Sequence, residues 1–312
     1  MKFLNEYREG ERMQGVYMCK QKTSAVTKNG KAYENVVLQD KSGVMDAKIW
    51  NPNDPGIDDF DALDFVDVVG DVSVYNGSMQ VSISRARKCE AGEYDMANYL
   101  PTTQKDKKEM YQKLRNLIDS IENPYYNKLL NNMFVDDKEF LKKFYNSSAA
   151  KAVHHGFVGG LLEHSLSVAE VCAYFAEHYP LLNRDLIVTA AICHDIGKTK
   201  ELSLYPENDY TDVGNLLGHI VIGSEMISEY AKEIPDFPEK DLNQLKHCIL
   251  AHHGELEYGS PKKPALIEAV ALSFADNVDA KMETFKELLE NAQGDGWLGY
   301  NRLLDSNVRK TL

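Results

Sequence analysis

The chain lacks the features of secreted, disulfide-rich and membrane-embedded proteins. It has no stretch approaching the ~20 apolar residues that cross a bilayer. Its first eight residues contain no apolar core, so we expect no secretory signal. Its five cysteines are odd in number and lack a Cys-x-x-Cys pair, which argues against a disulfide framework and a zinc ribbon. We therefore expect reduced thiols, a cytoplasmic location and no membrane partner.

An excess of positive charge is also missing. The net charge of −13 at pH 7 argues against a protein that coats nucleic acid by bulk electrostatics. A nucleic-acid enzyme stays open, because carboxylates gathered around metal ions add negative charge and a local basic groove can coexist with an acidic whole. The 312 residues, 43% of them hydrophobic and 27% charged, suit a globular chain of about two domains.

Residues 11–89 show the alternation and tight turns of β-strands. Asn-Gly pairs at 29–30 and 76–77 predict hairpin turns. The run 44–50 alternates apolar and polar residues, as a half-buried strand does. Five short strands with tight turns in this part of the chain predict a small five-stranded barrel.

From about Thr103 onward, helical periodicity replaces this alternation. A charged amphipathic helix is expected at 105–121, and the composition shifts near residue 90. We therefore expect a multidomain protein, β then α, with a barrel at 1–92, a helical linker region at 93–149 and an all-α domain at 150–312. The helices expected in the last region span residues 161–179, 185–193, 215–232, 241–253 and 264–280.

Histidine is absent from the first 153 residues, and all nine histidines fall between His154 and His253. A lone histidine beside an apolar helical run is most often a hydrogen-bonded core residue. The nearly unbroken apolar run 186–193 changes this interpretation, because His194 and Asp195 follow it directly. Ionisable groups at the end of a buried helix are costly unless they are paired or bind metal. We therefore expect a cation held by His194 and Asp195.

Further imidazole and carboxylate groups lie on apolar helical segments. His164 is at the edge of one apolar face, and His219 is on another apolar segment. His252 lies on the core side of its expected helix. Asp276 interrupts an apolar run in which an unpaired carboxylate would be disfavoured. Each residue alone is ambiguous, but several helices that deliver such groups from apolar faces indicate one metal centre.

The order His164, His194-Asp195, Asp276 resembles the H…HD…D pattern of the HD superfamily of metal-dependent phosphohydrolases. The additional His219 and the pair at 252–253 resemble the branch that binds two ions, in which the HD aspartate bridges both. The barrel with its run 43–50, looking like an OB-fold, and the segment 154–165 together resemble the YhaM-type 3′→5′ exoribonucleases. Such enzymes place an OB-fold nucleic-acid-binding domain before an HD domain.

This resemblance implies hydrolysis of single-stranded RNA, with single-stranded DNA left open, to nucleoside 5′-monophosphates. It implies two divalent ions per chain, with manganese or cobalt favoured and iron or zinc allowed. A homo-oligomer is expected. The implied ligands are His164, His194 and Asp276 for one ion and His219 and His252 for the other, with Asp195 shared.

Three further side chains are expected to act beside the ions. Lys198 would neutralise phosphate charge or protonate the leaving group, or it would only partner a helix dipole. His155 and His253 are expected to contact phosphate, with a hydrogen-bonded structural histidine as the alternative for each. The segment His154–Gly160, whose glycines allow close backbone approach, is expected to recognise the 3′ end.

Aromatic side chains of the barrel are candidate stacking surfaces for unpaired bases. Tyr33 and Trp50 are the favoured pair, and Tyr17 and Tyr75 are weaker candidates. Strand aromatics are also ordinary β-formers, so several could fill the barrel core instead. The lysines expected near them are Lys20, Lys22, Lys28, Lys31 and Lys48.

Other functions stay open at this level. A two-metal site of this kind also suits a phosphodiesterase for cyclic or small nucleotides, which would leave the barrel as an unexplained accessory. A di-iron oxygenase uses a closely similar ligand set, although an OB-like domain argues against it. A nucleic-acid-binding regulator with a vestigial site is disfavoured, because a ligand-type residue stands at every expected position.

Overall fold

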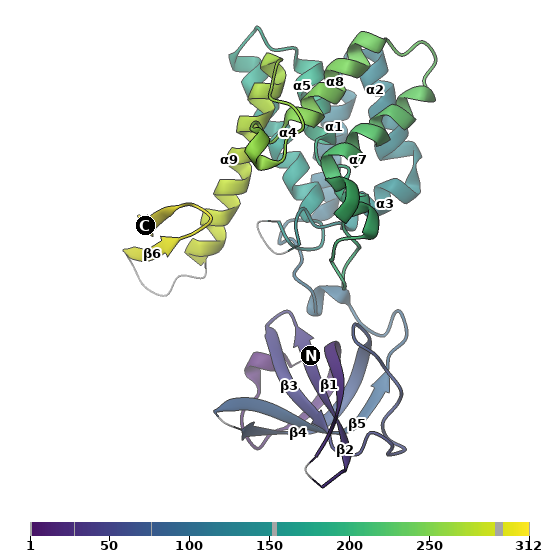
Figure 1. Ribbon diagram of the computed structural model, residues 1–312, viewed down its shortest axis with the longest axis vertical. Coiled ribbons are helices and arrows are strands. Elements are labelled where there is room, and N and C mark those ends of the chain that lie inside the picture. The colour runs from purple at the N-terminus through teal and green to yellow at the C-terminus, as the bar shows by residue number, and fades with distance from the viewer. Residues whose placement is uncertain (1, 28, 76, 152–154, 291–295, 312) are drawn as a thin grey trace. The chain divides into compact units, whose positions relative to one another are not determined.

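The computed structural model describes residues 2–27, 29–75, 77–151, 155–290 and 296–311 (Figure 1). The chain divides into two compact units, Met1–Pro101 and Thr102–Leu312. The first unit contains a β-barrel and the second is mainly helical, which confirms the expected order of β before α. Within the described ranges, no helix is long and apolar enough to cross a membrane.

Five strands form a closed barrel in the order β1-β2-β3-β5-β4, which confirms the expected five-stranded barrel. β3 and β5 pair in parallel, whereas the other neighbours are antiparallel. The 3-10 helices η1 (Leu4–Glu6) and η2 (Met96–Asn98) flank the barrel in sequence. The strands are β1 (Arg12–Val26), β2 (Ala32–Asp40), β3 (Gly43–Ile49), β4 (Phe65–Tyr75) and β5 (Ser78–Lys88).

Alternating side chains fill the barrel. In β3, Met45, Ala47 and Ile49 are buried in its core, as the alternation in the sequence predicts. Gly70 lies at an irregularity between β4 and β5, where a Cβ atom would stand 2.6 Å from the carbonyl oxygen of Ser82. Only glycine therefore allows the two strands to approach this closely.

The second unit contains nine α-helices in its described residues, followed by a two-stranded sheet that the helical periodicity does not predict. Its short elements are the π-helical turn η3 (Asn132–Asp136), the 3-10 helix η4 (Leu256–Tyr258), β6 (Trp297–Asn301) and β7 (Ser306–Arg309). The helices are α1 (Lys107–Asp119), α2 (Pro124–Asn131), α3 (Lys138–Asn146), α4 (Gly160–His178), α5 (Arg184–Cys193), α6 (Lys198–Glu201), α7 (Asp212–Lys232), α8 (Glu239–Ala251) and α9 (Ile267–Glu290).

One hydrophobic core runs through this unit. Leu114 of α1, Leu130 of α2 and Phe144 of α3 belong to the same buried cluster as Leu162 of α4 and Val188 of α5. Each large apolar side chain buried in this way stabilises the fold by about 1.5–3 kcal/mol. The helices of residues 107–146 therefore share a core with the histidine-bearing helices.

Two helix ends position the site. The α5 residues from Leu186 to Cys193 are buried, and the helix ends where His194 begins. α7 is interrupted at Gly218, whose φ of 72° and ψ of 155° are not helical. Glycine adopts this conformation without a steric penalty. The interruption leaves the backbone N–H of His219 to donate a hydrogen bond to Glu201 Oε1, 2.9 Å away.

Candidate metal centre

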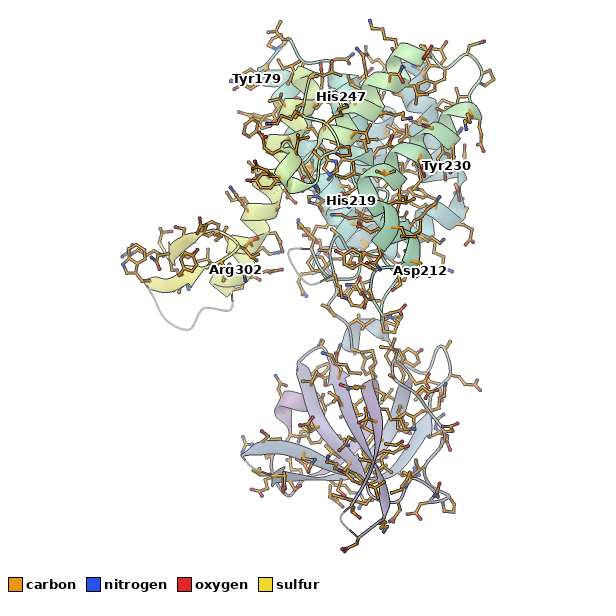
Figure 2. All side chains as sticks on the ribbon, in the orientation of Figure 1. Tyr179, Asp212, His219, Tyr230, His247 and Arg302 are labelled. Atoms are coloured by element: carbon orange, nitrogen blue, oxygen red, sulfur yellow. The ribbon has the colours of Figure 1, made fainter. Side chains whose placement is uncertain are left out.

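The six side chains expected to bind metal come together inside the helical unit. His164 lies on α4, His219 on α7 and Asp276 on α9. His194 and Asp195 directly follow α5, and His252 directly follows α8. Figure 2 shows His219 within the helical unit, whereas the exposed Tyr179 lies at its edge. His164, His194, Asp195 and His252 are buried.

One group of possible ligands consists of His164, His194 and Asp276. The Nε2 atoms of the two histidines lie 3.1 Å apart. Asp276 Oδ1 lies 3.2 Å from Nε2 of His164 and 3.9 Å from Nε2 of His194. Two ring nitrogens this close repel each other unless a proton or a cation lies between them.

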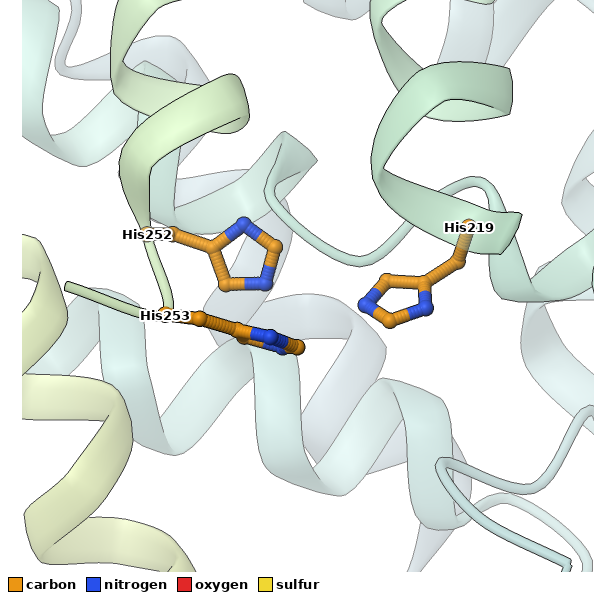
Figure 3. A group of neighbouring side chains, drawn as sticks. All are labelled: His219, His252 and His253. Atoms are coloured by element: carbon orange, nitrogen blue, oxygen red, sulfur yellow. The ribbon is translucent and has the colours of Figure 1, made fainter. Parts of the chain in front are cut away.

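The second group consists of His219, His252 and His253. Figure 3 shows the imidazole rings of His252 and His253 side by side at the end of α8, with His219 facing them from α7. The ring centroids of His252 and His253 are 4.4 Å apart, and those of His219 and His253 are 5.3 Å apart. His253 therefore joins a ligand-type cluster that the sequence assigned to His219 and His252 alone.

The carboxylate of Asp195 lies between the two groups. Its Oδ2 is 3.4 Å from the Nε2 atoms of both His164 and His194. Its Oδ1 is 3.4 Å from Nε2 of His219 and 3.7 Å from Nε2 of His252. Each oxygen thus faces a different group, which is the geometry that a carboxylate needs to be shared by two ions.

Buried polar atoms without partners show that these residues fit a metal. Among the described residues, Asp195 Oδ1, His219 Nε2 and His252 Nε2 are buried and accept or donate no hydrogen bond. An unsatisfied buried group of this kind costs about 1–3 kcal/mol. All three atoms face the same space, and imidazole nitrogen with carboxylate oxygen is a donor set for zinc, iron or manganese.

Five imidazole rings are oriented by hydrogen bonds on the side of each ring that faces away from the centre. Each ring donates a hydrogen bond from Nδ1 to a carbonyl or carboxylate oxygen, so its Nε2 atom is directed to the centre. The sequence did not predict the two carboxylate partners, Glu201 and Asp279. The Nδ1 bonds run from His194 to Ala191 O (2.7 Å), from His252 to Ile249 O (2.7 Å), from His253 to Tyr258 O (2.7 Å), from His164 to Asp279 Oδ2 (2.7 Å) and from His219 to Glu201 Oε1 (3.0 Å).

The electrostatics of the centre favour an ionised Asp195 and neutral rings at His252 and His253. Burial raises the pKa of Asp195, but the charges of Lys198 and neighbouring imidazoles outweigh burial and hold this pKa well below its ordinary value. Burial lowers the pKa of His252 well below its ordinary value, and it also lowers the pKa of His253. Burial lowers the pKa of His164, but its contacts with Asp195, Asp276 and Asp279 outweigh burial and raise this pKa well above its ordinary value, so metal binding there would release a proton. The neutral rings of His252 and His253 are already in the state that metal binding requires.

Lys198 reaches the centre directly. Its ammonium lies 2.7 Å from Asp195 Oδ2, and its side chain is largely buried. Lys198 is the first residue of the four-residue helix α6, and its ammonium is bound to the carboxylate of Asp195. Lys198 therefore balances the charge of Asp195 and lines the same cleft as the ligand-type residues.

The structure favours new roles for the two histidines expected to contact phosphate. His155 is buried, and its Nε2 lies 2.9 Å from Asp279 Oδ2, so it acts on Asp279 rather than on a ligand in the cleft. His253 lines the cleft, but its Nδ1–H is used by Tyr258 and its neutral ring leaves only a lone pair at Nε2. A bare nitrogen cannot donate a hydrogen bond to phosphate. His154 lies outside the described residues.

In the barrel, the structure separates the candidate aromatics. Tyr33 and Trp50 stack with centroids 5.2 Å apart, Trp50 is 44% exposed, and the Lys48 ammonium lies 5.3 Å from the Tyr33 ring. Tyr17 is fully buried, with its hydroxyl 3.0 Å from that of Tyr7, so the expectation of a stacking role for Tyr17 is wrong. The side chain of Tyr17 belongs to the barrel core, so its ring is not available to stack on a base.

The other candidates of the barrel also differ in their surroundings. Tyr75 is exposed at the end of β4. Lys22 lies 3.3 Å from Glu34 in an ion pair, so its charge is already balanced. Lys20 and Lys31 are exposed, and Lys28 lies outside the described residues.

Comparison with known proteins finds a matching family model and several similar sequences. Residues 161–281 match the family model for the HD domain. The 3′-5′ exoribonuclease YhaM of Bacillus velezensis is 36% identical over 285 residues, covering 91% of this chain and 90% of that protein. The enzyme of the same name from Bacillus subtilis is 35% identical over 285 residues, with the same two coverages. That of a Geobacillus species is 34% identical over 290 residues, covering 92% and 88%.

A solved structure also matches part of the chain. The second OB-fold domain of replication protein A from Methanococcus maripaludis covers 30% of this chain and 98% of its own length, at 16% identity. Its TM-score is 0.22. The relatives named above match at more than 30% identity over nine-tenths of the chain, and the chain belongs to the family of the 3′-5′ exoribonuclease YhaM.

Proposed function

We propose that this chain is a metal-dependent 3′→5′ exonuclease that hydrolyses single-stranded RNA to nucleoside 5′-monophosphates. The relatives that match nine-tenths of its length are named 3′-5′ exoribonucleases, and the HD match covers the whole metal centre. The observation that carries the proposal is the position of Asp195, whose two oxygens face two separate groups of imidazole nitrogens. Phosphodiester hydrolysis is a reaction for which paired ions are suited.

The residues divide into two ligand sets. We assign His164, His194 and Asp276 to one ion and His219, His252 and His253 to the other, with Asp195 shared. When bound, two such ions activate water and neutralise the charge of the reacting phosphate. Manganese or cobalt is proposed for both positions, because the mixed imidazole and carboxylate set accepts these ions.

Lys198 is proposed to contact the phosphate once metal ions take over the charge of Asp195. In the described structure its ammonium is bound to Asp195 Oδ2, the oxygen nearest His164 and His194. An ion at this oxygen would reduce the hold of the carboxylate on the lysine. The ammonium would then be free to neutralise phosphate charge or to donate a proton to the leaving oxygen.

The barrel is proposed to bind the single strand. The partly exposed stack of Tyr33 and Trp50, with Lys48 beside it, offers an aromatic face and a positive charge. Aromatic faces of this kind bind unpaired bases with little sequence preference. The partner is therefore single-stranded RNA, with single-stranded DNA as a second substrate to be tested.

The experiment uses metal-free protein and 5′-labelled single-stranded RNA, resupplied with manganese, cobalt, iron or zinc one at a time. We expect a ladder that shortens from the 3′ end, release of nucleoside 5′-monophosphates and a block at a stable 3′ duplex. A circular RNA of the same sequence should survive. Cleavage of the circle at a comparable rate would instead indicate an open-groove phosphodiesterase.

Two further expectations belong to this proposal. The five free and buried cysteines agree with a reducing compartment, and we propose a cytoplasmic location. We also propose a homo-oligomer. Light scattering after size-exclusion chromatography tests the oligomer, because a mass equal to that of one chain would contradict it.

A further inference from the structure

The cleft beside the metal centre contains two side chains that the metal ions do not need. It has a volume of about 440 Å³, within the range of about 300–1,000 Å³ typical of small-molecule sites. Apart from the ligand-type residues and Lys198, its lining includes Tyr258 and Lys281. These two residues come from different elements, η4 and α9.

Tyr258 presents an unused aromatic face to this cleft. Tyr258 is 66% exposed. Within the described residues, its side chain makes no hydrogen bond, ring contact or cation–π contact. Its backbone is held firmly, because its carbonyl oxygen accepts the Nδ1–H of His253 at 2.7 Å. The backbone of Tyr258 is therefore held next to a ligand-type histidine while the face of its ring stays available.

Lys281 presents an unpaired positive charge to the same cleft. It is exposed, and it has no ion-pair partner among the residues that the structure describes. The positions three and four residues away on α9 are Asn277, Val278, Thr284 and Phe285, so no carboxylate stands where an ion pair along the helix would form. A cation left unpaired beside a metal centre is suited to an anionic ligand.

We propose that Tyr258 and Lys281 form a subsite for the 3′-terminal nucleotide, in which the ring stacks on the base and the ammonium binds a backbone phosphate. The inference rests on the proposed exonuclease function and adds the residues that hold its substrate. Stacking is tolerant of sequence because every base has a flat face. The subsite therefore accepts each nucleotide in turn, as stepwise degradation requires.

A binding experiment tests the stacking without requiring turnover. The full chain in Mn²⁺ is titrated into a single-stranded RNA that ends in 2-aminopurine, with a phosphorothioate last linkage to slow cleavage. The wild type and Tyr258→Phe should quench the fluorescence, whereas Tyr258→Leu should not and should bind about tenfold more weakly. Tyr174→Leu, which removes a similarly exposed ring outside the cleft, should behave as the wild type does.

A kinetic experiment then separates stacking from a structural role. The substrates are an RNA with a normal 3′ nucleotide and the same RNA with an abasic one. On the normal RNA, Tyr258→Leu should raise KM about tenfold relative to the wild type, with kcat unchanged. On the abasic RNA, the variant and the wild type should have the same KM. Equal losses on both substrates, or no loss on either, would overturn the subsite. If the wild type shortens neither RNA, the exonuclease function fails, and the fluorescence arm still decides the subsite.

The phosphate contact is tested by salt dependence. Binding of single strands weakens with salt in proportion to the phosphates neutralised, with a log–log slope of about −0.7 for each. Lys281→Gln should reduce the slope by about that amount, whereas Lys232→Gln, an exposed lysine on α7 outside the cleft, should leave it unchanged. An unchanged slope for Lys281→Gln overturns the proposal.

Discussion

The Nδ1 atom of His164 lies 2.7 Å from Oδ2 of Asp279, a carboxylate one helical turn beyond the expected ligand Asp276. The same oxygen lies 2.9 Å from Nε2 of His155, and the other oxygen accepts a hydrogen bond from the Ser167 hydroxyl. Asp279 is thus held by three side chains while it orients one imidazole. Carboxylates in this position fix the tautomer of a metal-binding histidine and raise its basicity.

Replacing Asp279 with asparagine should weaken metal binding by about 10- to 100-fold. The amide keeps the size of the side chain but removes the negative charge that supports His164. Activity measured against manganese concentration should shift to higher metal while kcat at saturation is largely restored. The matched variant Asp119→Asn changes an exposed carboxylate of α1 and should leave the metal titration unchanged. A normal titration for Asp279→Asn would remove this positioning role.

Replacing Asp195 with alanine should abolish both hydrolysis and metal binding, while the helical fold stays intact. The substitution removes the only carboxylate that faces both groups of imidazoles in the described structure, and it leaves Lys198 buried without its partner. Metal content by mass spectrometry, far-ultraviolet circular dichroism and RNA degradation are measured on the same sample. Near-normal activity with unchanged metal content would contradict the assignment of Asp195 as the shared ligand.

Replacing Gly218 with alanine should disturb the second group of ligands and spare the first. A non-glycine residue at φ 72° and ψ 155° costs about 1–3 kcal/mol, so the backbone should relax and move His219. We expect loss of the weaker-bound metal fraction, read by metal analysis after dialysis. Gly10→Ala, at φ +83° in open space of the first unit, provides a strained control that should keep its metal. Equal metal content in both variants would contradict the prediction.

Replacing Trp50 with leucine should raise KM for long single strands with little change in kcat. Loss of a stacked base costs about 1–3 kcal/mol, which corresponds to a KM increase between about fivefold and 150-fold. Cleavage of a dinucleotide should be unaffected, because it is too short to use remote binding. A parallel effect on the dinucleotide would show that Trp50 supports the fold and does not bind the strand.

Replacing Asp137 with alanine should lower the free energy of unfolding by about 1 kcal/mol at pH 7. Its carboxylate caps α3 through the N–H of Phe140 and accepts the Tyr230 hydroxyl, and these bonds hold its pKa below the ordinary value. A depressed pKa stabilises the fold above the ordinary pKa of the carboxyl, and this contribution is lost as the pH falls through the folded value. Urea unfolding of the wild type and variant should therefore converge in acid. Asp136→Ala, which removes an exposed neighbour, should change little at either pH.

Much of the site could be predicted from the sequence because its signals are local. The apolar run before His194 requires burial wherever the chain folds, and a buried His-Asp pair requires a charged partner. The helical spacing around His164 and His252 places both on apolar faces by periodicity alone. The structure brings all six expected ligand residues together.

Other features depend on contacts between distant segments. Asp279 and Glu201 became partners of His164 and His219 only through the packing of α9 on α4 and of α6 beside α7. Nothing in the local pattern distinguishes these carboxylates from the many exposed acidic residues of the chain. Likewise, Tyr17 and Trp50 look alike in the sequence as strand aromatics, but Tyr17 is buried within β1 whereas Trp50 directly follows β3 and is partly exposed.

The amino-acid sequence by itself determined the order of barrel and helices and the identity of the ligand-type residues, because alternation, periodicity and residue chemistry act over a few positions. The tertiary structure alone decided which oxygen of Asp195 faces which imidazoles, which carboxylates orient the rings and which aromatic face lines the cleft. Those outcomes depend on distances of a few ångströms between segments far apart in the chain. Such distances are set by how the helices pack against one another, and local patterns do not specify them.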